Sequence, residues 1–284
     1  MRTVVEAITM EGANDATEID RIKQTTNTDD VVCNLAAVSE HTLTTSCLRL
    51  HPTICTDTRT IFFDLDNTLY SKHLGIHEEV GQRISLFFQT CLGLPEEECH
   101  ELRNKYLLDY GLAIKGLLSN FQINPLEYDE FVDGGLNLEA KLKKDIQLID
   151  NLQSIKARKW VFTNAGLRHA RRVLKLLEIE DLFEGIVYCD YCEPNFPAKP
   201  DRLGFIRAMR CAGVDKMEDC WFVDDSKNNI RTALELGWHA VYLEEFEDTS
   251  KMLLDSNAAD DKIKSIRGLS ELQSVFPELY KTRF

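Results

Sequence analysis

Long apolar runs are missing from this chain of 284 residues. No segment approaches the roughly 18 consecutive apolar residues that a membrane-spanning helix needs, so we expect no membrane insertion. The N-terminal residues also lack the apolar core of a secretory signal, and acidic residues occur early in them. We therefore expect a cytoplasmic protein, with the nucleus as the alternative location.

An excess of positive charge is also missing. The chain has 47 Asp and Glu against 33 Lys and Arg, which gives a formal net charge of −14. Nucleic acids bind to basic patches, so we expect no nucleic-acid partner. A small anionic substrate remains compatible with this composition, because a metal ion and one or two lysines can reverse the sign of the charge locally.

Neither histidine nor cysteine forms an obvious functional cluster. The seven histidines are scattered, and we interpret His169 and His239 as structural or surface residues. The nine cysteines are an odd number, and several lie in apolar runs. We interpret them as reduced side chains that serve as small hydrophobes.

Composition changes near residue 58. Residues 1–57 are rich in Thr, Ser, Asp and Asn and carry only a short apolar patch, which predicts a mostly disordered N-terminal extension. Five short runs of β-branched and aromatic residues then predict buried parallel strands at 60–63, 160–162, 186–188, 221–223 and 240–243. Helical patterns alternate with them at about 167–178, 201–212 and 227–236. This alternation predicts an α/β fold with a doubly wound, Rossmann-like parallel sheet.

Between the first two predicted strands the chain shows helical periodicity and no convincing strand. The helical segments are about 77–92, 96–118, 125–133 and 145–155. In the first of them, Ile84, Phe87, Phe88 and Cys91 recur at helical spacing. We therefore predict a helical insertion over residues 73–155, above the C-terminal edge of the sheet, with residues 58–72 and 156–284 forming the α/β core.

Two carboxylates, Asp64 and Asp66, directly follow the first predicted strand. At the C-terminal end of a parallel strand both can point into the crevice where open α/β sheets bind ligands. Like charges this close need a cation or a shared proton. One carboxylate can attack phosphorus, and the other can donate and accept the protons that the two halves of such a reaction need. The alternative is a strand-end turn with solvated aspartates.

Three further polar groups follow later strands. Thr163 and Asn164 end the second strand, where a helix N-terminus offers a phosphate site or, alternatively, only a cap. Lys199 precedes a proline and could balance phosphate charge, or could be a surface lysine. Asp224 and Asp225 end a fourth strand and supply hard oxygen ligands for Mg²⁺, or only a cap. All these positions meet at one edge of a parallel sheet, which favours one functional site.

The order D-x-D-x-T, hydrophobic-Thr, Lys-Pro and hydrophobic-Asp-Asp resembles the four motifs of the haloacid dehalogenase superfamily over about residues 58–245. The resemblance implies that Asp64 is the nucleophile and Asp66 the general acid and base. It further implies that the helical insertion is a C1 cap. Dehalogenases of this superfamily lack the second aspartate, so Asp66 favours a phosphatase or phosphomutase.

The resemblance also assigns the binding residues. It implies that Thr163, with Asn164, and Lys199 bind the phosphate. It implies that Asp225, with Asp224, binds Mg²⁺. Asp64 and the backbone carbonyl of Asp66 would complete the protein ligands.

A narrower resemblance is to the fungal and plant pyrimidine 5′-nucleotidase group, carried by residues 63–70, 110–117, 162–165 and 223–230. It implies a nucleoside 5′-monophosphate substrate, pyrimidine over purine, and we expect Tyr110 and Lys115 of the cap to contact it. For these two residues the alternative is helix packing and a solvated lysine. Sugar phosphates or lysophosphatidate are alternative substrates, and a degenerate binding or regulatory protein is the alternative of another class. The sequence leaves the oligomeric state open.

Overall fold

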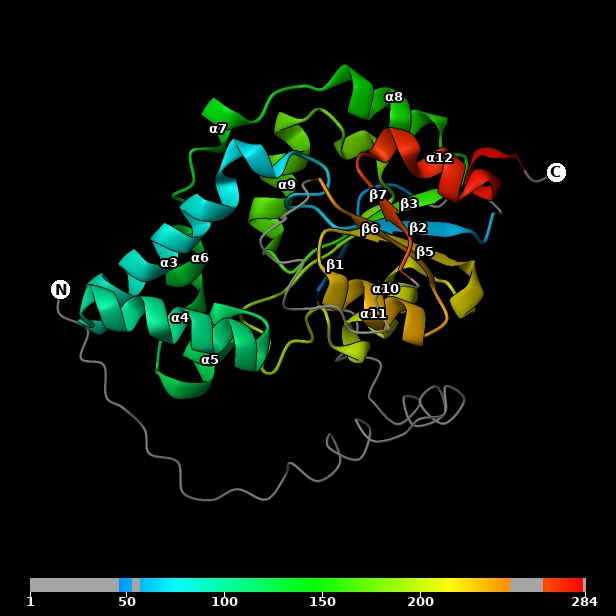
Figure 1. The fold of residues 1–284 in the computed structure, drawn as a ribbon. Coiled ribbons are helices and arrows are strands. Elements are labelled where there is room, and N and C mark those ends of the chain that lie inside the picture. Colours follow the sequence, from blue (N-terminus) through cyan, green and yellow to red (C-terminus); the bar gives the residue numbers. More distant parts are fainter. Residues whose placement is uncertain (1–45, 53–56, 246–262, 283–284) are drawn as a thin grey trace, which may run out of the picture.

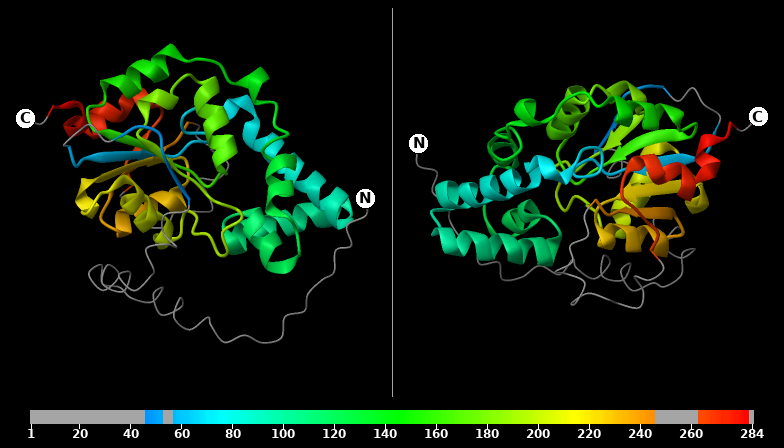
Figure 2. Two further views of the ribbon diagram at one scale, coloured as in Figure 1. Left: turned by 180° about the vertical axis from the view of Figure 1, so that it is seen from behind. Right: turned by 45° about the horizontal axis from the view of Figure 1, so that its top comes forward.

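The computed structural model describes residues 46–52, 57–245 and 263–282. Within them, a central sheet carries helices on both faces, and a separate group of helices stands beside it (Figure 1). The two further views in Figure 2 show the same separation. The predicted α/β fold with a helical insertion after the first core strand is therefore confirmed.

The described part of the sheet has seven strands in the order β1-β4-β3-β2-β5-β6-β7. Every neighbouring pair is parallel except β1 and β4. The strands are β1 (Cys47–Arg49), β2 (Thr60–Phe63), β3 (Arg158–Phe162), β4 (Gly185–Val187), β5 (Cys220–Asp224), β6 (His239–Leu243) and β7 (Ser265–Ile266). The five strands predicted from the sequence are all present.

Side chains of β2 alternate between the two faces of the sheet, as the strand period of two requires. Ile61 and Phe63 enter a core cluster with α8 (Ile146–Ser154), α9 (Leu167–Leu176) and α12 (Leu272–Val275). Phe62 enters the opposite cluster with α10 (Arg202–Ala212) and α11 (Lys227–Glu235). Both faces are buried, which explains why the strand reads as an unbroken apolar run.

Local signals fix the ends of α10, the helix that follows Lys199. The Asp201 carboxylate accepts a hydrogen bond from the Leu203 amide at 3.0 Å and caps the N-terminus. Gly213 ends the helix in the left-handed conformation, with φ of 66°. The sequence therefore sets where the segment that carries Lys199 joins the core.

The cap consists of α3 (Ile76–Leu92), α4 (Glu96–Tyr110), α5 (Ala113–Asn120) and α6 (Pro125–Phe131). It has its own apolar cluster, in which Ile84, Phe87 and Phe88 are buried. Cys91, predicted on the same face, is exposed. The predicted helical segment 96–118 is two helices, because Gly111 adopts a φ of 75° and ends α4.

The last part of the predicted insertion packs with the core instead of the cap. Helix α7 (Leu138–Lys141) and α8 place Leu138, Leu148 and Leu152 in the cluster that contains Ile61 and Val161. The predicted cap of residues 73–155 is therefore too long at its C-terminal end. Periodicity gives the helix but not the partner that its apolar face meets.

The predicted disordered extension over residues 1–57 is wrong for its described part at 46–52. Cys47–Arg49 forms strand β1 and pairs antiparallel with β4. Ser46 is buried, and its hydroxyl donates to Glu193 at 2.7 Å. Backbone pairing with β4 orders this segment, together with packing of Cys47 and Leu50 against the two core clusters, so its polar composition was a misleading signal. Residues 1–45 and 53–56 of the predicted extension lie outside the described residues.

Two other expectations concern membrane insertion and the cysteine side chains. None of the helices in the described ranges is long and apolar enough to cross a membrane. All cysteines in the same ranges are free, and Cys99, Cys189, Cys211 and Cys220 are buried, as small hydrophobes would be.

Candidate active site

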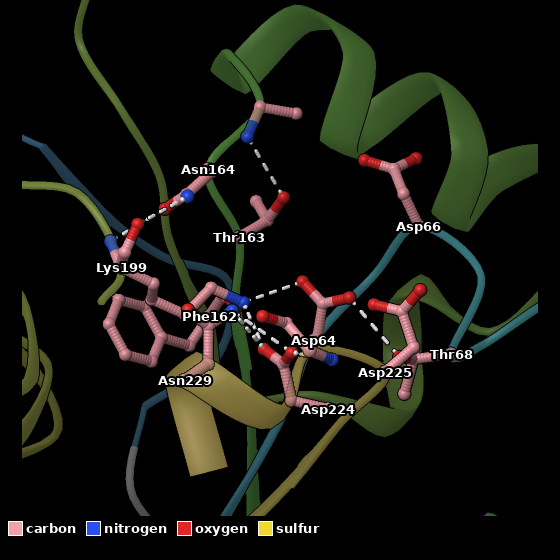
Figure 3. Close-up of polar contacts among 12 residues, drawn as sticks. Asp64, Asp66, Thr68, Phe162, Thr163, Asn164, Lys199, Asp224, Asp225 and Asn229 are labelled. Carbon is pink, nitrogen blue, oxygen red and sulfur yellow. Dashed lines mark hydrogen bonds and ion pairs between the residues drawn. The ribbon is translucent and has the colours of Figure 1, made fainter. Parts of the chain in front are cut away.

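The polar side chains singled out in the sequence gather at the C-terminal edge of the sheet. Phe63 at the end of β2 lies in register with Val161 of β3 and Val223 of β5. The residues that follow these strand ends are therefore neighbours, and Asp64 and Asp224 both project into one crevice (Figure 3). Parallel strand order alone produces this meeting.

Lys199 is the centre of the site. Its side chain is buried, with 2% exposed, and its ammonium uses all three donors. It donates to Asp64 Oδ1 at 2.6 Å, to Asp224 Oδ2 at 2.7 Å and to the Phe162 carbonyl at 2.7 Å. Burial opposes the charged form, but the two carboxylates outweigh it and raise the lysine pKa. The ammonium is therefore held charged beside Asp64.

The two carboxylates that end β5 differ in their partners. Asp224 is fully buried and accepts from Asn229 Nδ2 at 2.9 and 3.0 Å and from the Ser226 amide at 2.8 Å, in addition to Lys199. Asp225 is less buried and accepts from Asn67 Nδ2 at 3.3 Å. Asp224 is thus occupied in holding the lysine, whereas Asp225 keeps acceptor capacity for another ligand.

Asp64, Asp224 and Asp225 form a carboxylate cluster, with one oxygen of each within 4.8 Å of the others. Burial raises the pKa of Asp64 well above its ordinary value despite the opposing charge of Lys199. Burial and the charge of Asp224 raise the pKa of Asp225 to about 6. Concentrated negative charge on hard oxygen atoms fits a divalent cation such as Mg²⁺, which would relieve this repulsion.

Thr163 and Asn164 have different roles. The Thr163 hydroxyl is buried and accepts from the Ala165 amide at 3.0 Å, at the edge of the same crevice. Asn164 instead binds the backbone of Lys199 twice, through Nδ2 to the carbonyl at 2.8 Å and through Oδ1 from the amide at 2.8 Å. Its amide group therefore braces the lysine segment, a use different from the phosphate contact that the sequence suggested.

Asp66 is turned away from the carboxylate cluster and towards α9 (Figure 3). Its Oδ1 lies 2.6 Å from the Tyr70 hydroxyl and 2.7 Å from His169 Nε2. Burial opposes its ionised form, but the charge and hydrogen bond of His169 outweigh that and lower the Asp66 pKa. Conversely, burial opposes the histidine charge, but Asp66 raises the His169 pKa to about 9.

His169 is a residue whose role the sequence interpretation missed. The other buried residues of α9 are Ala170, Val173 and Leu174, and all three are apolar. A histidine on the apolar face of a helix beside a motif was the available signal. The contact itself joins residues 103 positions apart and could not be read from spacing.

Thr68 and Asn67 are two further site residues that the sequence motif contained without an assigned role. The Thr68 hydroxyl donates to Asp64 Oδ2 at 3.1 Å. Asn67 adopts a φ of 60° and points its amide at Asp225. The turn after β2 therefore orients the carboxylates of Asp64 and Asp225 through these two hydrogen bonds.

The cap touches the site through the turn between α4 and α5. A Cβ on Gly111 would lie 3.7 Å from both the Lys199 carbonyl and Pro200 Cδ. Tyr110, with 38% exposed, packs edge-on against Tyr106 at 5.7 Å between ring centroids. Lys115 Nζ lies 5.3 Å from the centre of the Phe196 ring. The suggested substrate residues thus lie beside the segment that carries the lysine, and both already contact protein.

That segment is itself part of the cap's apolar cluster. Cys189, Phe196 and Ala198 pack with residues of α3, α4 and α5. The lysine therefore reaches into the core crevice from a loop that is packed under the cap.

The family described as haloacid dehalogenase-like hydrolase matches residues 58–237, more than half of the chain, and confirms the resemblance seen in the motifs. Phosphate metabolism protein 8 of Saccharomyces cerevisiae is 39% identical over 197 residues, which are 65% of this chain and 61% of the yeast protein. The match thus spans about three fifths of that relative's length.

Solved structures share the fold. A phosphatase of the same superfamily from Thermococcus onnurineus has a TM-score of 0.50 at 19% identity, over 77% of this chain and 97% of that one. The haloacid dehalogenase-like protein SP0104 from Streptococcus pneumoniae has a TM-score of 0.51 at 19% identity, over 78% and 100%. At this identity the likeness concerns the fold alone.

Proposed function

This chain belongs to the haloacid dehalogenase-like hydrolase family, and from that premise we propose that it is a Mg²⁺-dependent phosphomonoesterase that acts through a phosphoaspartate. The observation that carries the proposal is the buried Lys199 ammonium, which lies 2.6 Å from Asp64. A nucleophilic carboxylate beside a fixed cation can bind and attack a dianionic phosphate, whereas a solvated strand-end aspartate has no such partner.

In the proposed first half-reaction, an oxygen of Asp64 forms a bond to phosphorus while the ester P–O bond breaks. The departing oxygen keeps the electron pair and takes a proton from Asp66, which must be protonated at the start of this step although His169 lowers its pKa in the free site. In the second half-reaction, the oxygen of a water molecule bonds to phosphorus, its proton goes to Asp66, and the bond between phosphorus and Asp64 breaks. Inorganic phosphate and the original enzyme result.

The remaining groups bind the phosphoryl group. Lys199 supplies charge and donors, and the Thr163 hydroxyl supplies a further donor at the N-terminal side of α9. Asp64, Asp225 and the backbone carbonyl of Asp66 would hold Mg²⁺, with Asp224 chiefly fixing Lys199. The ion would neutralise phosphate charge as a Lewis acid.

We further propose nucleoside 5′-monophosphates as substrates, with pyrimidines preferred. The core groups recognise only phosphate, so selection must come from the cap, whose Tyr110–Gly111 turn lies against the lysine segment. A pocket that hydrogen-bonds the edge of a pyrimidine would reject a purine by size and by unpaired polar groups. The name of the yeast relative, phosphate metabolism protein 8, is compatible with a phosphatase.

The test is turnover of p-nitrophenyl phosphate, UMP, CMP, AMP, GMP, a hexose phosphate and lysophosphatidate by the full chain, in EDTA, in Mg²⁺ and in Ca²⁺. We expect no turnover in EDTA, recovery in Mg²⁺, poor recovery in Ca²⁺, which does not enforce octahedral geometry, and higher kcat/KM for the pyrimidines. Full activity in EDTA would contradict the metal assignment. Preference for a sugar phosphate or lysophosphatidate would contradict the substrate, and no turnover of any ester would favour a binding protein.

The cap's part in selection has its own variants. Tyr110→Phe and Lys115→Met should change the ratio of kcat/KM between UMP and AMP while sparing p-nitrophenyl phosphate, which has no base. A ratio unchanged in both variants would place selection elsewhere in the cap.

A further inference from the structure

One oxygen of Asp66 is held from two sides. Tyr70, four residues further along the turn after β2, donates its hydroxyl to Oδ1 at 2.6 Å. His169 places Nε2 2.7 Å from the same atom. Among the described residues Oδ2 has no hydrogen-bond partner, and 35% of the Asp66 side chain is exposed. The carboxylate is thus fixed by one oxygen and presents the other.

Among the described residues the imidazole of His169 has one hydrogen-bond partner, Asp66, and the negative charge of Asp133 also helps to raise the pKa of the ring. The ring is 3% exposed, and its Nδ1 has no hydrogen-bond partner. Burying a polar ring with one nitrogen unpaired costs free energy that an aliphatic side chain would not cost. The hydrogen bond to Asp66 is the contact that an apolar residue at this position of α9 could not make.

The element that carries the ring is also fixed to its neighbours. Arg168 forms an ion pair with Glu130 at the end of α6, and Arg172 pairs with Glu139 of α7. Arg172 also donates to the Leu136 carbonyl at 2.7 Å. These contacts on both sides of His169 tie α9 to the segment between the cap and the core, so the ring is held on a rigid support.

We propose that His169 is a positioning residue for the acid and base Asp66. With Tyr70, it fixes Oδ1 so that Oδ2 is the atom that gives a proton to the departing oxygen and takes one from water. This inference rests on the proposed function, in which Asp66 has that role. His169 itself does not contact the reacting atoms.

The experiment compares His169→Leu, His169→Gln and Tyr70→Phe with the unchanged chain, using phenyl phosphate and p-nitrophenyl phosphate in Mg²⁺. The value of kcat/KM reports the steps up to phosphoenzyme formation, where only the poorer leaving group depends strongly on the proton from Asp66. We expect His169→Leu to lower kcat/KM for phenyl phosphate about 10- to 100-fold, as loss of a supporting partner commonly does, and to lower it much less for p-nitrophenyl phosphate.

Two matched comparisons separate positioning from packing. Glutamine can place its Nε2 where the imidazole Nε2 lies, so His169→Gln should recover most of the loss. His100→Asn changes an exposed histidine of α4 and should leave both esters unaffected. Tyr70→Phe keeps the ring and removes the other donor, so it should reproduce the same leaving-group dependence if His169→Leu fails to fold.

A double-mutant comparison gives the decisive result. If His169 acts through Asp66, His169→Leu should cost less than twofold further in an Asp66→Asn background. Equal losses for both esters, or a full additional loss in that background, would overturn the proposal while leaving the phosphatase intact. Absence of turnover in the unchanged chain would instead overturn the proposed function, and the positioning role with it.

Discussion

At the scale of single residues, the site depends on a balance of buried charges. Lys199 lies between Asp64 and Asp224, and each of these two carboxylates approaches the ammonium within 2.7 Å or less. None of the three could be buried alone at neutral pH without a large desolvation cost. The same ion pairs therefore serve folding and the binding of phosphate.

Replacing the lysine tests this balance. Lys199→Met should destabilise the fold by about 3–5 kcal/mol, because two carboxylates lose their buried counter-charge. Denaturant unfolding without divalent metal measures the change. Adding Asp224→Asn should recover part of the lost stability by removing one of the uncompensated charges. Wild-type stability in the single variant would mean that the ammonium is not buried as described.

Replacing the nucleophile tests the chemistry. Asp64→Asn should lower kcat by several orders of magnitude, because an amide cannot form the acyl-phosphate and the change is nearly isosteric. Asp109→Asn, at an exposed position of α4, is the matched control and should be neutral. Retention of a tenth of the wild-type rate in Asp64→Asn, measured with p-nitrophenyl phosphate, would rule out the covalent route.

At the scale of elements, the loop before α10 joins the cap to the core. Phe196 and Ala198 pack among cap residues, while the next residue, Lys199, enters the crevice. Asn164 holds the same segment from the end of β3. The position of the ammonium therefore depends on apolar packing within the cap cluster and on the Asn164 side chain.

Two glycines that end cap helices can test whether the cap supports the position of Lys199. Gly111 and Gly93 both have positive φ, 75° and 70°, so valine is strained at either site. A Cβ at Gly93 meets nothing within 4 Å, whereas one at Gly111 lies beside the Lys199 carbonyl and Pro200. We expect both substitutions to lower Tm, but only Gly111→Val to lower kcat/KM, by about tenfold or more, since displacement of catalytic groups by about 1 Å is costly. Equal activity in the two variants would show that the turn does not support the lysine.

At the scale of the whole molecule, one edge of the sheet is completed by strand β1, which precedes the core predicted from the sequence. Strand β1 pairs with β4, and Arg207 donates to both Ser46 Oγ at 2.9 Å and Glu193 at 2.8 Å. Glu193 belongs to the loop that leads to Lys199. The N-terminal strand therefore closes the sheet and supports the base of that loop.

Two truncations test this role. Deletion of residues 1–52 should cost about 2–4 kcal/mol of stability, since several hydrogen bonds of roughly 1 kcal/mol each are lost. Deletion of residues 1–45 keeps β1 and should leave Tm and kcat nearly unchanged. Thermal unfolding and p-nitrophenyl phosphate turnover measure both quantities. Identical behaviour of the two truncations would show that β1 contributes no stability.

The core strands, the helical cap and the edge of the sheet that carries the site could be predicted from the sequence alone, because the signals for them are local. Short apolar runs predict the core strands. Because these strands are parallel, the residues that follow them, such as Asp64 and Asp225, lie at the same edge of the sheet. Helical periodicity and a long gap between two strands gave the cap. Each of these inferences needs only neighbouring residues and the geometry of a parallel sheet.

Tertiary structure alone decided which partner each polar group meets. In the folded chain Asp66 contacts His169, 103 residues away, and Asp224 accepts a hydrogen bond from Lys199. The Asn164 side chain hydrogen-bonds the backbone of the lysine segment. Tertiary structure also assigned α7 and α8 to the core and ordered β1 through backbone pairing. Such contacts depend on three-dimensional packing and on backbone hydrogen bonds, which are nearly independent of side-chain type, so spacing along the chain carries no record of them.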